Sequence, residues 1–426
     1  MATPALFVTF VICLAINVPI GAALGVASLA AIIASPTINI SLLTRNLVTS
    51  IDSFPLMAVP FFILAGEIMG RGGISRRLLD TARALFGRFT GGYGLVTVAT
   101  CMFFAAISGS GPATVAAIGS LMIPSMVDKG YAKGYAGAIV SAAGSIGVII
   151  PPSIPMVVYS VAVGTSISTM FIAGVLPGLL IGFALMVINY SISRKNGYVG
   201  EDRRYTVAEK AKIVWDSKWS LLVPIIILGG IYGGIFTPTE AAVVAVAYGL
   251  LVGVVVYRDI KVREIYDIFR QAGLITATAM IILGAATAFG RILTREQVPA
   301  HLANMIVSFT DSRFVILMLI NILLLIVGCF METLAAILIL APILLPVVTR
   351  VGVDPIHFGI IMIVNLAIGF ITPPVGVNLF VACGIAKISL EEVSRAIIKP
   401  LIVMVIVLLL ITYIPSISLL LPALLL

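Results

Sequence analysis

Charged side chains are scarce in this sequence. Lys, Arg, Asp and Glu make up only 10% of its 426 residues, whereas 61% are hydrophobic. A soluble globular domain has about 25% charged residues, so the composition excludes a soluble fold. Uncharged runs longer than the ~20 residues that cross a bilayer as a helix recur along the chain. The alternating polarity of a membrane strand is missing, which argues against a β-barrel. We therefore expect an all-α integral membrane protein.

Other absences exclude classes of chemistry. The four cysteines lie in apolar segments without metal-ligand spacing and are predicted to be free thiols: Cys13, Cys101, Cys329 and Cys383. The segment SGSG at 108–111 resembles a serine nucleophile among glycines, but such a nucleophile needs a general base. The chain has only two histidines, His301 and His357, and both fall near the outer ends of segments. Because a Walker-type phosphate loop is also missing, we predict neither an enzyme nor an ATP-driven motor.

The few charges that are present indicate a multi-pass topology. Basic loops stay in the cytoplasm, so we place there the loops 71–88, 128–133, 194–218, 258–270 and 385–399. This assignment puts 21 of the 26 Lys and Arg residues inside. Five remain outside: Arg45, Arg291, Arg295, Arg313 and Arg350. The net charge of +8 therefore reflects topology, and no binding to nucleic acid is expected.

Two apolar runs are too long for a single crossing. Residues 89–127 contain no charge in 39 residues, and residues 314–349 contain only Glu332 in 36. As one helix, either run would exceed ~50 Å, whereas the hydrocarbon core is ~30 Å thick. Each run is therefore predicted to fold back as a re-entrant helical hairpin, with one tip at 109–112 and the other near Glu332.

Two Pro-Pro pairs mark an internal repeat. Pro151-Pro152 and Pro373-Pro374 are separated by a sequence offset of 373 − 151 = 222, and Gly147 and Gly369 keep the same offset. The charge distribution starts the two halves on opposite sides of the membrane, so the repeat is predicted to be inverted. Proline removes a backbone donor and disrupts the preceding turn, so each pair predicts a broken helix. Paired interruptions in inverted repeats indicate the binding site of a secondary transporter.

The predicted tips and interruptions supply the candidate site residues. Free carbonyl oxygens suit a cation such as Na⁺, and helix N-termini suit an anion. We predict one sodium site at Ser108, Ser110, Gly111, Gly147, Ile150 and Ser153, and a second at Gly328, Thr333, Gly369, Thr372 and Val375. The candidate substrate contacts are Ser108, Ser110, Arg295, Glu332, Asn365 and Asn378.

Each candidate also has a structural interpretation. Small residues such as Ser108 and Ser110 serve close helix packing, and Arg295 could snorkel to the interface. Glu332 could form a structural pair, and the two asparagines could satisfy freed backbone groups. Outside the predicted site, Glu67 and Arg71 are predicted to pair at i, i+4 on a helix.

Two further patterns predict local structure. Thr237 to Glu240 has the arrangement of a capping box, with Pro238 at the first helical position. The stretch 74–88 places apolar residues at helical spacing beside arginines, which predicts an amphipathic helix on the inner membrane surface.

Five stretches together resemble the large permease subunit of TRAP transporters, the tripartite ATP-independent periplasmic systems, of the DctM type. They are PFFILAGEIMGRGGISRRLL at 60–79, AISGSGPATVAAIGSLMIP at 106–124, GVIIPPSIPMVVY at 147–159, GIFTPTEAAVVA at 234–245 and GFITPPVGVNLF at 369–380. The resemblance implies an elevator transporter of the ion transporter superfamily in the bacterial inner membrane. It also implies a small four-helix membrane subunit, a periplasmic substrate-binding protein and Na⁺-driven import of a carboxylate. Sialic acid is the preferred substrate and a C4-dicarboxylate the next; no organic cofactor is expected.

This interpretation divides the chain into a scaffold and a transport domain. We expect the scaffold at 1–90, 166–292 and 387–426, and the two halves of the transport domain at 91–165 and 293–386. The competing hypothesis is a stand-alone Na⁺- or H⁺-coupled anion carrier, or a Na⁺/H⁺ exchanger, because inverted repeats also serve exchangers.

Overall fold

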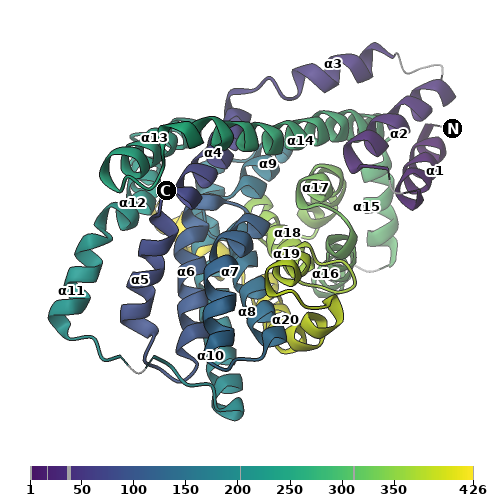
Figure 1. Cartoon of the computed structure of the whole chain (residues 1–426). Coiled ribbons are helices and arrows are strands. Elements are labelled where there is room, and N and C mark those ends of the chain that lie inside the picture. Colours follow the sequence, from purple (N-terminus) through teal and green to yellow (C-terminus); the bar gives the residue numbers. More distant parts are fainter. Residues whose placement is uncertain (1, 17, 36–39, 202, 310–311, 426) are drawn as a thin grey trace.

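The structure, a computed structural model, describes residues 2–16, 18–35, 40–201, 203–309 and 312–425. Within these ranges the regular structure is entirely helical (Figure 1). Seven of the described helices are long and apolar enough to cross a membrane, and a bent pair at 207–232 raises the number to eight. The expected all-α membrane protein is therefore confirmed.

The first part of the chain forms five α-helices and one 3₁₀ turn. Its segments are α1 (Ala2–Ala15), α2 (Ile20–Ala34), α3 (Ser41–Thr49), the 3₁₀ turn η1 (Phe54–Met57), α4 (Ala58–Arg71) and α5 (Ile74–Phe86). Pro19 directly precedes α2, and α1 packs against α2. The sequence around Pro19 thus separates two helices. The amphipathic helix expected at 74–88 is α5, which buries Ile74, Leu78 and Leu79.

A helical hairpin and an interrupted helix follow. The segments are α6 (Gly92–Ser108), α7 (Gly111–Asp128), α8 (Lys133–Ser145), the 3₁₀ turn η2 (Ile146–Val148), α9 (Ile154–Val163) and the long α10 (Ile167–Asn196). The hairpin α6–α7 packs against α8 and η2. Helical structure stops between η2 and α9, at the first Pro-Pro pair.

The C-terminal part repeats this order of elements. Its segments are α16 (Arg313–Phe330), α17 (Thr333–Arg350), α18 (Pro355–Gly369), α19 (Val377–Ala386), α20 (Leu390–Tyr413) and α21 (Ser416–Leu425). The bounds of α7 and α17 share the offset of the Pro-Pro pairs, at the first residue (333 − 111 = 222) and at the last (350 − 128 = 222). Gly130 and Gly352, at the same offset, both have positive φ, of 83° and 74°. Both Pro-Pro bonds are cis.

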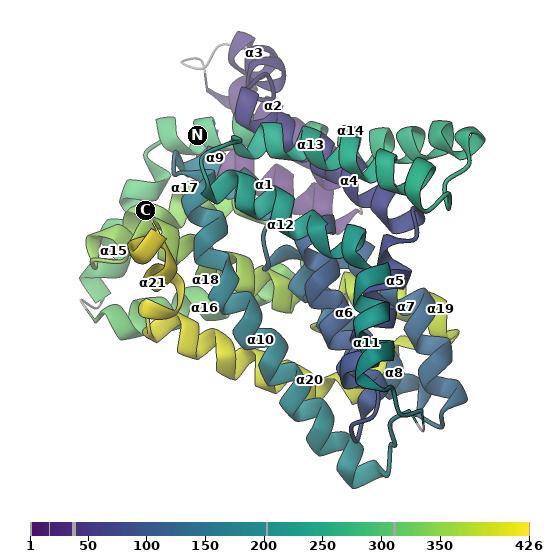
Figure 2. The ribbon, with the colours of Figure 1, turned by 90° about the vertical axis from the view of Figure 1, so that its left-hand side faces the viewer.

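The remaining helices join these two parts. They are α11 (Val207–Asp216), α12 (Lys218–Tyr232), α13 (Pro238–Leu250), the π-helical η3 (Leu251–Val256), α14 (Val262–Arg295) and α15 (Val298–Phe309). The predicted capping box opens α13: the Glu240 carboxylate accepts from the Thr237 N–H at 2.8 Å, and the Thr237 hydroxyl accepts from the Glu240 N–H at 3.3 Å. The 34-residue α14 runs along one edge of the molecule in both views (Figures 1 and 2) and packs against α2, α3, α4 and α17.

The helices α10 and α20 pack against both of the expected parts of the chain. Our boundaries assign both helices to the scaffold. The helix α10 contacts the first hairpin through α6 and the interrupted helices through α9 and α18, and α20 contacts the interrupted helices through α8 and α18. The helix α10 also packs against α21, which our boundaries place in the scaffold. The two helices also pack against each other (Figure 2). Each of them therefore packs against the interrupted helix that precedes it in the sequence.

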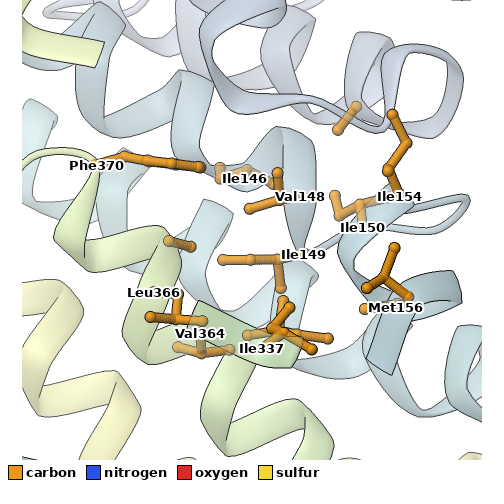
Figure 3. Packing of buried hydrophobic residues seen from close by; sticks show 14 of the residues in the cluster. Ile146, Val148, Ile149, Ile150, Ile154, Met156, Ile337, Val364, Leu366 and Phe370 are labelled. Atoms are coloured by element: carbon orange, nitrogen blue, oxygen red, sulfur yellow. The ribbon is translucent and has the colours of Figure 1, made fainter. Parts of the chain in front are cut away.

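Apolar side chains hold the two interruptions together. Figure 3 shows Ile149 of the first interruption near Ile337 of α17, and Ile150 near Ile154 of α9, and all of these side chains are buried. Phe370, at the second interruption, points toward Ile146. Burial of a side chain of this size contributes about 1.5–3 kcal/mol in water, but helices in lipid gain mainly from close packing. The interruptions therefore form one tightly packed centre.

Candidate functional site

The first hairpin turns within two residues. Gly109 has φ +59°, a left-handed conformation that glycine adopts without steric cost, and it ends α6 directly after Ser108. Ser110 then precedes α7 in extended backbone, and its side chain makes no capping hydrogen bond. The hydroxyl groups of Ser108 and Thr114 lie 2.8 Å apart, and Thr114 donates to the Ser110 carbonyl oxygen at 2.7 Å. The tip thus gathers several oxygen atoms and no charge.

The first interruption lies against this tip. A Cβ atom on Gly147 would stand 2.6 Å from the Ser110 carbonyl oxygen, so the absence of a side chain permits the approach. The Ile154 N–H donates to the Gly109 carbonyl oxygen at 3.4 Å, which joins the start of α9 to the tip. Ser153 caps α9 by accepting from the backbone three residues later. Residues from tip and interruption, distant in sequence, therefore meet as expected.

The second tip has a different chemistry. Glu332 occupies the N-cap position of α17, and its carboxylate accepts from the Leu334 N–H at 2.8 Å and the Ala335 N–H at 3.1 Å. A carboxylate at a helix N-terminus is favoured by the unpaired N–H groups and the helix dipole. Behind the tip, a Cβ atom on Gly369 would stand 2.4 Å from the carbonyl carbon of Gly328. The second interruption therefore touches its hairpin backbone to backbone.

A cavity of about 350 Å³ opens between the two tips. Its walls also include residues of α4, α9, α14 and both interruptions. The lining is largely apolar; the charged side chains among the described lining residues are Glu67 and Glu332, and no Lys, Arg or His is among them. We refer to this space as the central cavity.

The predicted residues divide into those that line the central cavity and those that surround it. Ser108, Ser110, Glu332 and Thr333 line it. The other predicted sodium ligands lie outside the lining, on α7, α16 and the two interrupted helices: Gly111, Gly147, Ile150, Ser153, Gly328, Gly369, Thr372 and Val375. Arg295, at the exposed end of α14, does not line it either.

The two asparagines are fully buried behind the central cavity. Asn365 donates to the Asn321 side-chain oxygen at 2.7 Å, and Asn321 donates to the Thr412 hydroxyl at 3.1 Å. Asn378 donates to the Ser141 carbonyl oxygen at 3.2 Å. Neither asparagine lines the cavity. Asn365 also donates to the Ile361 carbonyl oxygen at 2.9 Å, and the backbone carbonyls to which the two side chains donate lie within α18 and α8 rather than in the interrupted turns. Asn321 was missed because it is one amide in an apolar run without local pattern.

The predicted pair of Glu67 and Arg71 is wrong. No ion pair joins them within the described part of the chain, and the partly buried Glu67 lines the central cavity. The preceding residue explains this position. A Cβ atom on Gly66 would lie 3.4 Å from the Cα atom of Ser108, so α4 packs directly on the first tip and turns Glu67 into the cavity.

Several buried oxygen atoms near the interruptions have the chemistry of ligands for a hard cation. The side-chain oxygens of Thr333, Asn365 and Asn378 are buried and have no hydrogen-bond partner among the described residues. A buried polar atom without a partner costs about 1–3 kcal/mol, and neutral oxygens are the ligands of hard cations. No cluster of three or more His, Cys, Asp or Glu occurs in the described ranges. The donors present therefore fit Na⁺ better than a transition metal.

Comparison with known proteins assigns the family. Residues 7–417 match the model of the Tripartite ATP-independent periplasmic transporter, DctM component. The chain belongs to the DctM family. It is therefore a multi-pass transporter permease of the bacterial inner membrane and not an enzyme, as the sequence analysis predicted.

Named relatives of this DctM chain differ in their substrates. It is 53% identical to the isethionate TRAP transporter permease protein DctMQ of Oleidesulfovibrio alaskensis over 97% of this chain, which spans 65% of that relative's length. It is 43% identical to the C4-dicarboxylate TRAP transporter large permease protein DctM of Pseudomonas aeruginosa, over 87% of both chains. It is 40% identical to the sialic acid TRAP transporter large permease protein SiaM of Vibrio cholerae, over 96% of this chain and 95% of the relative.

A solved structure shares the fold at low sequence identity. The crystal structure of the Alcanivorax borkumensis YdaH transporter, described as having an unusual topology, superposes with a TM-score of 0.67 at 15% identity. The likeness covers 87% of each chain. The DctM chain therefore has a fold already found in a transporter.

Proposed function

We propose that this chain is the large permease subunit of a sodium-driven tripartite importer of a small organic anion. The observation that supports this best is the central cavity, which is lined by both hairpin tips and reaches both interruptions. Such interruptions at membrane depth supply backbone groups to substrates and coupling ions. Membership of a tripartite family further supports a small membrane subunit and a periplasmic binding protein as partners.

The transport mechanism that fits this arrangement is an elevator. In this proposal the hairpins and interrupted helices move together with α10 and α20, since these two helices pack on them. The constant sequence offset between the bounds of α7 and α17 supports two halves built alike, and the charge distribution favours opposite orientations in the membrane. The remaining helices, with α4 and α14 facing the cavity, would form the static scaffold.

The sodium sites proposed from the sequence remain compatible with the packing. One would use the oxygens of Ser108, Ser110 and Ser153 with the backbone at 111, 147 and 150. The other would use Thr333 and Thr372 with the backbone at 328, 369 and 375. A bound Na⁺ would supply positive charge beside the substrate anion in a cavity whose own charged lining is acidic.

The substrate class is proposed to be a small carboxylate or sulfonate. The three named relatives import isethionate, a C4-dicarboxylate or sialic acid according to their names, and the relative named for isethionate has the highest identity of the three, at 53%. We therefore place isethionate first, a C4-dicarboxylate next, and sialic acid, the preferred substrate of the sequence analysis, third.

Uptake into proteoliposomes tests the proposal. Vesicles holding this chain with its small subunit receive labelled isethionate, succinate or sialic acid, with the binding protein and an inward Na⁺ gradient each present or absent. Accumulation that needs both is the expected result, and the accepted label names the substrate. Accumulation without the binding protein would instead favour the stand-alone carrier, and indifference to Na⁺ would favour proton coupling.

A further inference from the structure

A second cavity, of about 430 Å³, continues along the same helices as the central cavity. On α9 the central cavity is lined by Ile154 and Pro155, and the second cavity by Val158 and Ala162. On α17 the lining likewise passes from residues 333 and 334 to residues 338 and 342. We refer to the second space as the outer cavity, because the end of α14 that it follows is outside in the topology.

One face of α14 connects the two cavities. Residues 275, 278, 279 and 282 line the central cavity, and residues 283, 287, 290, 291 and 294 line the outer one. This spacing of three and four residues keeps the lining positions on one side of the helix. From 275 to 294 the helix rises about 28 Å, at ~1.5 Å per residue. The two cavities are therefore stacked along a single wall that approaches the thickness of the hydrocarbon core.

The two cavities have opposite charge. The outer cavity is lined by Arg291 and by four hydroxyl groups, those of Thr49, Ser50, Thr287 and Thr294, and no acidic side chain is among its described lining residues. Arg291 forms no ion pair within the described ranges. A guanidinium presents several donors that match carboxylate and related oxyanions. The central cavity, by contrast, is lined by two carboxylates.

The geometry points to the outer cavity as an access site for the anionic group of the substrate, with Arg291 as its binding residue. The inference rests on the proposed function and adds a site to it. An organic anion approaching the central cavity from outside would meet Arg291 and its neighbouring hydroxyls first. The positive charge raises the local concentration of anions, and the guanidinium N–H groups replace part of their hydration. The hydroxyl groups of Thr49, Thr287 and Thr294 already donate to backbone carbonyl oxygens, so the guanidinium supplies the donors. Movement along α14 then brings the anion to the tips.

Charge replacement at position 291 tests this site. Arg291→Cys is expected to lower the initial uptake rate at subsaturating substrate about tenfold, which corresponds to ~1.4 kcal/mol. A cationic methanethiosulfonate reagent, which attaches a trimethylammonium group to the introduced thiol, should restore most of the rate. An anionic reagent of similar size, carrying a sulfonate, should lower it further. The Arg291→Lys variant, which keeps the charge, should retain most of the activity without reagent.

Arg45→Cys provides the matched control. Arg45 is also exposed and also outside in the topology, but it lines neither cavity. Uptake by this variant, and by the unmodified chain with its four native cysteines, should be indifferent to the sign of the reagent. The same labelled acids are used as above, and rates are normalised to correctly inserted protein. Rescue by the cationic reagent shows that the variant folds, because the same polypeptide regains function.

The outcomes distinguish a failure of the proposed transport function from a failure of the anion site in the outer cavity. If the unaltered chain accumulates none of the three acids under any gradient, the proposed function is wrong. If it accumulates one of them, and Arg291→Cys responds equally to both reagents, the outer cavity does not select for anionic charge and this inference is overturned. Loss of activity that neither reagent restores, together with an inactive Arg291→Lys, also overturns it, because the role of the residue is then structural.

Discussion

Replacing Gly369 by alanine tests whether the second interruption must touch its hairpin. A Cβ atom there would lie 2.4 Å from the carbonyl carbon and oxygen of Gly328, whereas ordinary contact begins at 3.4 Å. The helices α16 and α18 must therefore separate by 3.4 − 2.4 = 1.0 Å, since backbone atoms cannot turn aside as a flexible side chain would. Overpacking of this kind lowers the free energy of unfolding by about 1–3 kcal/mol. Replacing a helical glycine by alanine raises it by only ~0.5–1 kcal/mol.

The functional consequence should exceed the loss of stability. Binding constellations work only when they are held within about 0.5 Å of their productive geometry, and the required shift is larger. We expect Gly369→Ala to lower the thermal unfolding temperature moderately and to reduce uptake per folded molecule at least tenfold.

Gly384 of α19 supplies the control for this substitution. Apart from its chain neighbours and the adjacent backbone of its own helix, no atom of the described residues lies within 4 Å of the position of its Cβ atom, and its φ is not positive. Gly384→Ala should therefore be neutral or slightly stabilising and should leave uptake unchanged. Both variants are compared by thermal unfolding of the purified protein and by uptake into proteoliposomes. Equal behaviour of the two variants would refute the reasoning, because the close backbone approach would then have no cost.

Three further substitutions test individual side chains. Glu332→Ala removes the cap of α17 and should cost about 1 kcal/mol of stability, whereas Glu332→Gln keeps an acceptor oxygen; uptake should fall in both, and normal uptake would exclude a role for the charge. Glu67→Gln should alter uptake while Arg71→Gln does not. Equal effects of the two substitutions in the same assay would instead favour the ion pair between these residues that the sequence predicts. Burial raises the pKa of the Asp80 carboxyl despite nearby arginines. The contribution of Asp80 to stability is therefore greatest below the ordinary pKa of about 4, and it declines as the pH rises through the raised pKa. Asp80→Asn should therefore unfold at a higher temperature at pH 7 and lose this advantage near pH ~3, as thermal scans at the two pH values would show.

The hairpins and the interruptions were predictable because their signals are local. A run of 39 residues without charge cannot cross the membrane once, and the structure folds it at Gly109. Each Pro-Pro pair removes backbone donors whatever surrounds it, and helical structure stops at both. These features depend on length and backbone chemistry alone, so they can be read before any packing is known.

Glu67 was not predictable because its position depends on packing. Helical spacing placed Arg71 one turn away, which favoured a pair. The structure instead brings α4 onto the first tip through Gly66, a contact with Ser108 that is distant in sequence. The neighbours of α10 and α20 could not be read from the sequence for the same reason, since both are apolar helices without a pattern that specifies a partner.

The two tips show which features of the site the fold requires. Ser110 and Glu332 are related by the sequence offset of the two Pro-Pro pairs (332 − 110 = 222), and each occupies the N-cap position of the second helix of its hairpin. The helix α7 forms although the Ser110 side chain makes no capping hydrogen bond. A strong side-chain cap is therefore not needed to turn the chain at this position, and a neutral residue would satisfy the same backbone geometry. In the proposed topology the second tip lies at membrane depth, where an ionisable group is costly. We therefore propose that the carboxylate of Glu332 serves the chemistry of the central cavity that it lines, and not only the hairpin that it caps.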